Sequence, residues 1–408
     1  MRFSLNKLAS FHPETGSCPY SGTTNENCDF HLSRIFNALP RSENGSASLR
    51  CASARLSGRA LTSLLLAASL TLAVTSQQAD ACTRVMYKGP EQTILTGRSM
   101  DFAMPIPANL WVFPRGMQRQ GEVGANSISW TSKYGSLAVS SWDIATSDGM
   151  NEKGLVANML WLVESEYPAF SPQGDQPGLA ISLWAQYALD NFATVAEAVA
   201  ALGREDFVVV TDVIPGTDRM TTIHLSLSDP TGDNAIFEYI EGKLVIHHDP
   251  SYVVMTNDPP YQQQLAIQKY WDSIPGNQFL PGTVKAPDRF VRAHYYIHSI
   301  PQTSDPQVAT ASVFSVIRNT SVPYGYQIEG YPNLSTTQWR VVADHKHLRY
   351  FFETALTPNT FWVDLTKLDF SEQAQVKMLR VDQGQVYAGE TSAQFKAAKP
   401  FQFQGMDF

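Results

Sequence analysis

The chain has 408 residues, of which 43% are hydrophobic, and a formal net charge of −8. This length allows one large domain or two, and the hydrophobic content is typical of a globular protein. The acidic balance, without any cluster of Lys and Arg, argues against nucleic acid or an anionic membrane surface as a partner.

The first 81 residues carry the pattern of a secretory signal. The apolar run Leu61–Val74 is preceded by arginines and followed by the small-x-small triplet Ala79-Asp80-Ala81. The run is too short to span a bilayer, which needs ~20 residues. This order predicts a signal peptide over residues 58–81, cleaved after Ala81, and a periplasmic or secreted protein. Residues 1–57, rich in Ser, Asn and Arg, are interpreted as a disordered extension or the product of a misplaced start.

The cysteines give this cleavage site a chemical meaning. They stand at positions 18, 28, 51 and 82, so cleavage would make Cys82 the first residue and the single cysteine of the remaining chain. Two other interpretations stay open. Leu61–Val74 would be a buried helix in an unprocessed cytoplasmic protein, or Cys82 would be lipidated in a lipoprotein. The lipoprotein is the weaker one, because that processing usually requires a large aliphatic residue where this chain has Ala79.

Downstream of Cys82, alternation of apolar and polar residues predicts a β-hairpin with strands Thr83–Tyr87 and Thr93–Arg98. Leu179–Leu202 has helical periodicity, and Thr194 with Glu197 forms a capping-box pattern that opens a second helix within it. Another helix is predicted after Asp288. The remaining predicted strands are Ser127–Trp130, Ser136–Ser141, Leu155–Leu162, Phe207–Ile214, Thr222–Leu227, Ala235–Tyr239, Lys243–His248, Tyr252–Met255, Gln338–Val342, Leu348–Thr354 and Thr360–Asp364. Strand runs interrupted by helices favour α+β layers, and the lack of a linker predicts one domain over 82–408.

A cysteine that begins a processed chain carries two reactive groups. Its thiol is a nucleophile, and its free α-amine, with an ordinary pKa near ~8, is a base close to the operating pH. In this N-terminal-nucleophile arrangement the amine replaces the histidine of a catalytic triad. Arg98 and Asp101, within GRSMDF, end the second strand of the hairpin and so return toward residue 82. An arginine there favours the thiolate, and a carboxylate orients the amine. The alternative is a chance cysteine beside a surface ion pair.

Five sequence blocks, in this order along the chain, are similar to motifs of one known family. They are Cys82, GRSMDF (Gly97–Phe102), GMNEKGL (Gly149–Leu155), VMTNDP (Val254–Pro259) and DRFVR (Asp288–Arg292). TTQWRVVAD (Thr336–Asp344) adds a C-terminal block. Together they resemble the choloylglycine hydrolase family, which comprises penicillin V acylases and conjugated bile salt hydrolases, and they cover most of 82–408. The resemblance implies an N-terminal-nucleophile hydrolase with a four-layer αββα sandwich, in agreement with the α+β prediction.

The resemblance also implies roles for individual residues. Cys82 corresponds to the nucleophile, and Arg98 and Asp101 to the pair that flanks it. Asn257 corresponds to the asparagine whose side-chain N–H serves the oxyanion hole, and Arg289 to the second active-site arginine. Where the family commonly carries asparagine or tyrosine this chain has Trp161, whose backbone N–H is expected to serve the oxyanion.

The interval between Asn257 and Arg289 is shorter than in Gram-positive members, which is similar to the Gram-negative branch. In the Gram-positive members an inserted hairpin in this interval helps to assemble tetramers. A homotetramer of this chain would therefore need a different assembly mode.

An apolar acyl pocket is expected to be lined by some of the larger side chains near the site. Met100, Trp111, Trp161 and Tyr261 are the candidates, although aromatic residues are more often part of the core. No cofactor is expected, and neither a GxSxG elbow nor a phosphate loop occurs. His345 and His347 could share a strand face, but no third ligand accompanies them, so no metal site is predicted.

These observations predict a periplasmic amidohydrolase that cleaves a linear amide between an apolar acyl group and a polar amine. Penicillin V acylase is the first choice, and members of that branch are also associated with N-acyl homoserine lactones. Conjugated bile salt hydrolase is the alternative within the family. The alternative from another class is a periplasmic binding protein or lipoprotein that has the pocket but no catalysis.

Overall fold

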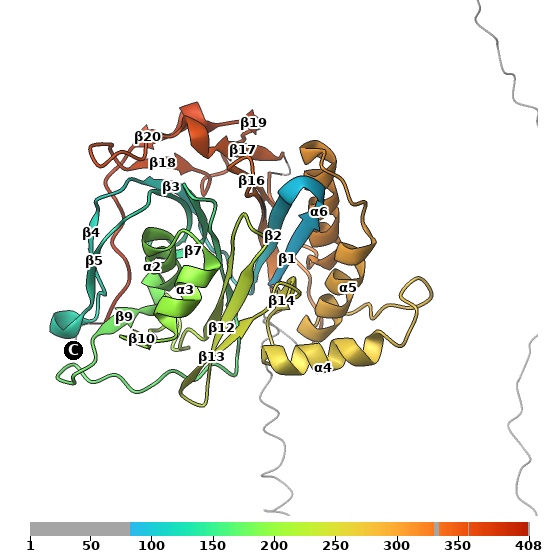
Figure 1. Cartoon of the computed structure of the whole chain (residues 1–408), viewed down its shortest axis with the longest axis horizontal. Coiled ribbons are helices and arrows are strands. Elements are labelled where there is room, and N and C mark those ends of the chain that lie inside the picture. The colour runs from blue at the N-terminus through green and yellow to red at the C-terminus, as the bar shows by residue number, and fades with distance from the viewer. Residues whose placement is uncertain (1–81, 330–333, 358, 407–408) are drawn as a thin grey trace, which may run out of the picture. The chain divides into compact units, whose positions relative to one another are not determined.

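Two large, mainly antiparallel sheets form the centre of the structure, which is a computed structural model (Figure 1). It describes residues 82–329, 334–357 and 359–406, so the predictions for 1–57 and for the signal peptide at 58–81 lie outside the described residues. In spatial order, the seven-stranded sheet of the described chain contains β14 (Val254–Thr256), β1 (Thr83–Gly89), β2 (Thr93–Phe102), β15 (Thr336–Asp344), β16 (Arg349–Thr354), β17 (Phe361–Asp364) and β19 (Gly389–Glu390).

The second sheet, nine-stranded over the same residues, contains β13 (Lys243–His248), β12 (Asn234–Ile240), β11 (Ile223–Ser228), β8 (Val156–Trp161), β7 (Ala145–Asn151), β6 (Ser136–Ser141), β3 (Asn109–Phe113), β18 (Lys377–Arg380) and β20 (Lys396–Ala397). Two small sheets pair β4 (Gln118–Gln120) with β5 (Ser129–Thr131) and β9 (Gly178–Ala180) with β10 (Val208–Val210). The 3-10 turns are η1 (Pro90–Gln92), η2 (Gly124–Asn126), η3 (Ile181–Leu183), η4 (Leu365–Lys367) and η5 (Ser392–Gln394).

Helices cover the outer face of each large sheet. The α-helices of the described residues are α2 (Trp184–Asn191), α3 (Val195–Leu202), α4 (Tyr261–Trp271), α5 (Ala286–Ser299) and α6 (Pro306–Thr320). α5 and α6 pack on the sheet that contains β1 and β2, whereas α2 and α3 pack on the other sheet (Figure 1). A Cβ at Gly97 would lie 2.7 Å from Val313, so a residue without a side chain lets α6 approach β2 closely. The layers are therefore αββα, which confirms the predicted sandwich.

The inner faces of the two sheets carry polar as well as apolar side chains. On β2, Thr96 and Arg98 point to the second sheet, where Thr96 contacts the Ser228 hydroxyl at 2.8 Å and Arg98 contacts Asp148 at 2.7 Å. Buried polar groups need partners, and a pair made across two sheets fixes the position of one sheet against the other. The Cys82 thiol and Arg98 lie in this inter-sheet space and at its edge, whereas Arg289 approaches the site from α5 on the other face of the sheet.

The local predictions agree with the structure where patterning is strong. Lys243–His248 and Ser136–Ser141 match β13 and β6, and the Thr194 hydroxyl accepts the Glu197 N–H at 3.2 Å as a helix cap. Three predictions need correction. The first residues of the predicted helical region Leu179–Leu202 belong to β9 and η3, and the strand predicted over Phe207–Ile214 shortens to β10. The helix predicted after Asp288 begins at Ala286, because Pro287 suits the first turn of a helix.

The described residues contain no helix that is both long enough and apolar enough to cross a membrane. Between Asn257 and Arg289 the chain forms α4 and the start of α5 and no strand.

Candidate active site

Strand pairing places Cys82 between two neighbouring strands. Thr83 pairs with Ser99 on β2 and with Thr256 on β14. One step back along the same antiparallel registers, Cys82 lies opposite Met100 on one side and Asn257 on the other. Residues that are far apart in sequence therefore meet at the start of β1.

The Cys82 thiol is buried and is surrounded by a positive charge and backbone groups. Its Sγ lies 3.6 Å from Arg98 Nη2 and 3.5 Å from the backbone N–H of Asp101. Burial raises the pKa of the thiol, while the charges of Arg98 and Arg289 and the Asp101 N–H lower it. Arg98 is thus the main group that favours the thiolate in an otherwise unfavourable environment.

Three acceptors hold the Arg98 guanidinium against the thiol. Nη1 donates to Asp148 Oδ2 at 2.7 Å, and Nη2 donates to the Met159 carbonyl at 2.8 Å and contacts Met100 Sδ at 3.2 Å. Asp148, on β7, is itself held by the Asn158 side chain at 2.9 Å. Arg98 and Asp148 are both fully buried, so this ion pair fixes the direction of the guanidinium without screening by water.

Asp101 turns its carboxylate to the opposite face of β2, toward α5 and β15. Burial raises the pKa of the carboxyl to about 6, against the lowering effect of Arg289, a hydrogen bond from Thr337 and the charge of Arg98. Its Oδ1 is buried and has no hydrogen-bond partner among the residues that the structure describes. An unsatisfied carboxylate oxygen at the strand position beside Cys82 suits an amine or ammonium at residue 82.

Asn257 is oriented by Arg289. Arg289 Nη2 donates to Asn257 Oδ1 at 2.9 Å, while Nη1 donates to Thr83 Oγ1 at 2.7 Å and to the Cys82 carbonyl. Because guanidinium groups only donate, Asn257 must present Oδ1 to Arg289 and its N–H groups to the other side. Nδ2 donates one hydrogen to the Trp161 carbonyl at 2.8 Å, which leaves the second hydrogen for a substrate oxygen.

The backbone of Trp161 faces the same place. The next residue, Leu162, donates its N–H to Thr222, so the backbone groups of Trp161 point away from β11 and toward Asn257. In an extended strand the N–H and C=O of one residue point to the same side. The Trp161 N–H is therefore directed toward the region between Asn257 and Cys82.

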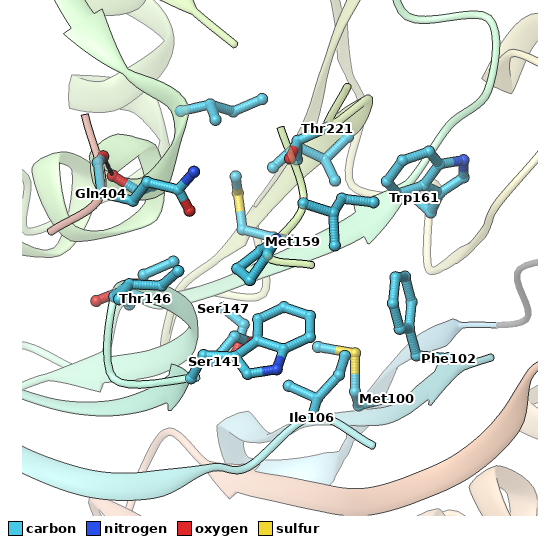
Figure 2. Close-up of a pocket in the computed structure, with 18 of the residues that line it drawn as sticks. Met100, Phe102, Ile106, Ser141, Thr146, Ser147, Met159, Trp161, Thr221 and Gln404 are labelled. Carbon is cyan, nitrogen blue, oxygen red and sulfur yellow. Dashed lines mark hydrogen bonds between the residues drawn. The ribbon is translucent and has the colours of Figure 1, made fainter. Parts of the chain in front are cut away.

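A pocket of about 830 Å³, including its open mouth, starts at Cys82 and is lined mainly by apolar side chains. Met100, Phe102 and Trp161 lie on one side of it, and Thr146 and Gln404 lie on the opposite side (Figure 2). Phe102 and Trp161 pack against each other with ring centroids 6.4 Å apart. An apolar cavity with a nucleophile at one end is typical of a site for an acyl group.

Comparisons with known proteins agree with this geometry. Residues 82–378 match the family described as "Linear amide C-N hydrolases, choloylglycine hydrolase family". The chain belongs to the choloylglycine hydrolase family. It is 50% identical over 348 residues to a penicillin V acylase of Pectobacterium atrosepticum, covering 80% of this chain and 93% of that protein.

The structure of a penicillin V acylase from Agrobacterium tumefaciens is 54% identical, with a TM-score of 0.75 over 80% of this chain and 100% of that chain. A bile salt hydrolase/transferase of Clostridium perfringens is 25% identical over 60% of this chain and 80% of that protein. Among choloylglycine hydrolases, this chain is therefore much more similar to the two penicillin V acylases than to that bile salt hydrolase. As a member of the family, it is an enzyme of the linear amide hydrolase class.

Of the four candidates for the acyl pocket of this family member, Met100 and Trp161 line it, and Trp111 and Tyr261 do not. Trp111 is 4% exposed and packs on Phe113 and Phe401, with its ring N–H bound to Asp143. Tyr261 is 1% exposed, at the start of α4. The expectation of substrate contact is wrong for these two because both side chains are enclosed in the core.

Several site residues escape sequence reasoning. Asp148 and Gln404 contact the site through registers and tail packing that no local pattern reveals. Glu238 acts from farther away, by holding the first residue of α4, the helix that follows Asn257. It accepts hydrogen bonds from His224 at 2.9 Å, His247 at 3.1 Å and the Tyr261 N–H at 3.0 Å. The described residues contain no cluster of three or more His, Cys, Asp or Glu side chains that could hold a metal ion.

Proposed function

We propose that cleavage after Ala81 makes Cys82 the first residue, and that the processed enzyme hydrolyses penicillin V or a closely similar amide. The observation that carries this proposal is the Cys82 thiol at one end of an apolar pocket, with Arg98 beside it and an Asn257 donor opposite. The match to the family begins at Cys82 itself, which supports processing at this residue.

In the first half of the reaction the α-amine of Cys82 takes the thiol proton and the sulfur attacks the amide carbon. Asp101 holds the amine, and Arg98 stabilises the developing thiolate. The Asn257 side chain and the Trp161 N–H stabilise the negative oxygen of the tetrahedral intermediate. The amine then returns the proton to the leaving nitrogen, which leaves as the free amine.

In the second half, water attacks the thioester that links the acyl group to Cys82. The α-amine takes a proton from this water, and the same two N–H groups stabilise the second tetrahedral intermediate. Collapse of the intermediate releases the carboxylic acid and restores the thiol. Each proton that the amine accepts is therefore returned within one turnover.

The pocket supports an apolar acyl group as the substrate part that enters it. Three hydroxyl groups of its wall direct their hydrogen atoms to protein acceptors: Thr146 to Gln186 Oε1, Ser147 to the Val139 carbonyl and Ser182 to the Gln404 carbonyl. A fatty acyl chain, as in an N-acyl homoserine lactone, satisfies the same condition as the phenoxyacetyl group. A bile salt, whose steroid body carries hydroxyl groups, remains the alternative.

We further propose a periplasmic location and keep the homotetramer as a prediction. Both depend on the mature protein: its N-terminal sequence and intact mass show whether residue 82 comes first and whether it is lipidated, and light scattering gives the assembly. A diacylglycerol adduct on Cys82 would block the amine and favour the lipoprotein alternative.

The experiment that tests the function compares turnover of penicillin V, a long-chain N-acyl homoserine lactone and a glycine-conjugated bile salt by the processed protein. We expect kcat/KM to be highest for one of the first two. Cys82→Ser should lower it by roughly 10²-fold or more, because a hydroxyl is a far weaker acid than a thiol. Cleavage of the bile salt alone would reverse the ranking, and no turnover of any amide would favour the binding-protein alternative.

A further inference from the structure

The pocket contains one residue from the C-terminal tail of the chain. Gln404 lines the same cavity as Cys82, yet it lies well beyond residue 378, where the match to the family ends. In Figure 2 the Gln404 side chain extends toward the cavity from the side opposite to Phe102 and Trp161. Met100, which contacts the Cys82 sulfur at 3.9 Å, lies on the Phe102 side. An acyl group attached to Cys82 therefore extends toward Gln404.

The tail is fixed at this point by its backbone. The Gln404 N–H donates to the Ile144 carbonyl at 2.8 Å, and the Gln404 carbonyl accepts from the Ser182 hydroxyl. Ile144 and Ser182 also line the pocket. The position of Gln404 is thus set by two wall segments, independently of its own side chain.

The side-chain amide of Gln404 is fixed as well. Nε2 donates to Asp212 Oδ2 at 2.8 Å and to the Val213 carbonyl at 2.9 Å. Both amide hydrogens are used in these bonds, so Gln404 has none left to donate to a ligand. What the residue presents to the cavity is bulk at a fixed position together with Oε1, which can only accept a hydrogen bond, so an apolar chain end meets it as a steric limit, the property of a pocket floor.

We propose that Gln404 is the floor of the acyl pocket and limits the length of the acyl chain that the enzyme accepts. This inference rests on the proposed function, since it requires that the acyl group occupy the cavity. It assigns a specificity-determining role to a segment outside the matched family region. The chemistry at Cys82 is not affected by this role.

The proposal predicts a change in selectivity rather than a general loss of rate. Gln404→Ala removes four heavy atoms from the floor and makes room for two or three more methylene groups. Each buried methylene corresponds to roughly 4-fold in kcat/KM. We therefore expect Gln404→Ala to increase the ratio of kcat/KM for long over short straight-chain acyl substrates by ~10-fold or more.

Two further variants separate the floor from a structural role. Gln404→Met keeps the side-chain length and volume but loses both hydrogen bonds to the 212–213 loop, so the floor proposal predicts the chain-length profile of the wild type. If Gln404 acted instead by holding the 212–213 loop through its hydrogen bonds, Gln404→Met and Gln404→Ala would show the same chain-length profile. Gln402→Ala, at an exposed position two residues earlier in the same tail, is the matched control and should leave the profile unchanged.

The measurement is kcat/KM for straight-chain acyl p-nitroanilides of increasing length, with the thermal midpoint of each variant as a check on folding. If the acyl-chain length with the highest kcat/KM increases in Gln404→Ala and in neither of the other two variants, the result supports Gln404 as the pocket floor. An unchanged profile, or equal loss at every length, overturns it even if the wild type is active. If the wild type hydrolyses none of the series nor penicillin V, the proposed function itself has failed.

Discussion

The Asn257 side chain can stabilise a substrate oxygen only through its second Nδ2 hydrogen. Its Oδ1 is bound by Arg289, and its remaining Nδ2 hydrogen points to the region beside Cys82. We expect Asn257→Ala to lower kcat by ~10²–10³-fold with little change in KM, the usual cost of removing one oxyanion donor.

Asn257→Asp is the matched variant, because it keeps an acceptor for Arg289 but has no N–H. It should lose as much activity as Asn257→Ala, because neither side chain can donate to the substrate oxygen. Steady-state kinetics and thermal unfolding of both variants check this. Activity near that of the wild type in Asn257→Asp would contradict the role of the amide.

We expect the Asp101 carboxyl to determine the acid limb of the pH profile of kcat/KM. Its carboxyl has a pKa raised to about 6 by burial, so it becomes neutral as the pH falls through that value. A neutral Asp101 no longer holds the charged form of the Cys82 amine, and kcat/KM should therefore decrease as the pH falls through the pKa of Asp101, which the ammonium of the processed enzyme lowers further.

Asp101→Asn should lower kcat/KM by roughly 10²-fold at neutral pH and should remove this acid limb. The measurement is kcat/KM between pH 4 and 8 for both proteins. An acid limb that is the same in the variant would assign the titration to another group.

The residues of the site fall into two groups: those that a short sequence motif identifies, and those that only the packing of distant segments brings to the site. Cys82, Arg98, Asp101, Asn257 and Arg289 stand in short motifs, so the sequence predicts them, and the structure brings them together. Asp148 and Gln404 depend on how distant strands and the tail pack, which a local pattern does not contain. Size and apolarity alone make Trp111 and Tyr261 candidates for the pocket, and these properties do not distinguish a pocket wall from a core.

At the scale of elements, α4 and the β11–β13 strands hold the loop that carries Asn257. Gln264 on α4 donates to the Asn257 carbonyl at 2.7 Å, and Glu238 on β12 accepts the N–H of the first residue of α4. Burial alone would raise the pKa of Glu238, but hydrogen bonds from His224 and His247 and the charge of His224 lower it to about 2.

This lowered pKa has a defined effect on stability. The ordinary pKa of glutamate is 4.5 here, so the native state binds fewer protons than the unfolded chain. Glu238 therefore stabilises the fold by about 3 kcal/mol above pH 4.5, and this contribution is lost as the pH falls toward 2.

Glu238→Gln should lower the free energy of unfolding at pH 7 and reduce its dependence on pH between 5 and 2. Glu241→Gln, exposed in the next turn, is the control and should change neither. Urea unfolding at several pH values tests this. Equal acid sensitivity of the wild type and Glu238→Gln would exclude the assigned role.

The sequence predicts a helix or strand where hydrophobic periodicity and the cap or turn residues agree, and fails to predict it where they conflict. The sequence pattern does not predict α6, although Asp305 and Pro306 form a good helix start, because Val, Thr and Ile in its interior favour strands. The pattern does not predict α4 either, because its polar YQQQLAIQKYW sequence gives a weak apolar face. Both helices are stabilised by packing, α4 against α5 and α6 against the sheet of β1 and β2, and that packing is not visible in their own residues.

At the scale of the whole described molecule, the Arg98–Asp148 pair joins the two sheets. Arg98 is on β2 and Asp148 is on β7, and neither side chain is exposed to solvent. Removing one partner leaves a buried charge alone, which typically costs 3–5 kcal/mol, whereas replacing both by apolar residues is often neutral. Stability alone therefore does not require this pair, and the thiol at Cys82 supplies the reason for a buried arginine here.

A double-mutant cycle tests this separation of stability from function. We expect Asp148→Leu and Arg98→Met each to lower the free energy of unfolding by about 3 kcal/mol or more, and the double variant to recover at least half of the summed loss. Urea unfolding measures the coupling, and kcat/KM measures activity on the same proteins. The double variant should stay inactive although it is folded, because no charge then favours the Cys82 thiolate. Strictly additive losses would show that the two charges are not coupled, which contradicts a pair that joins the sheets. Activity restored together with stability would show that the pair serves the fold and not the nucleophile.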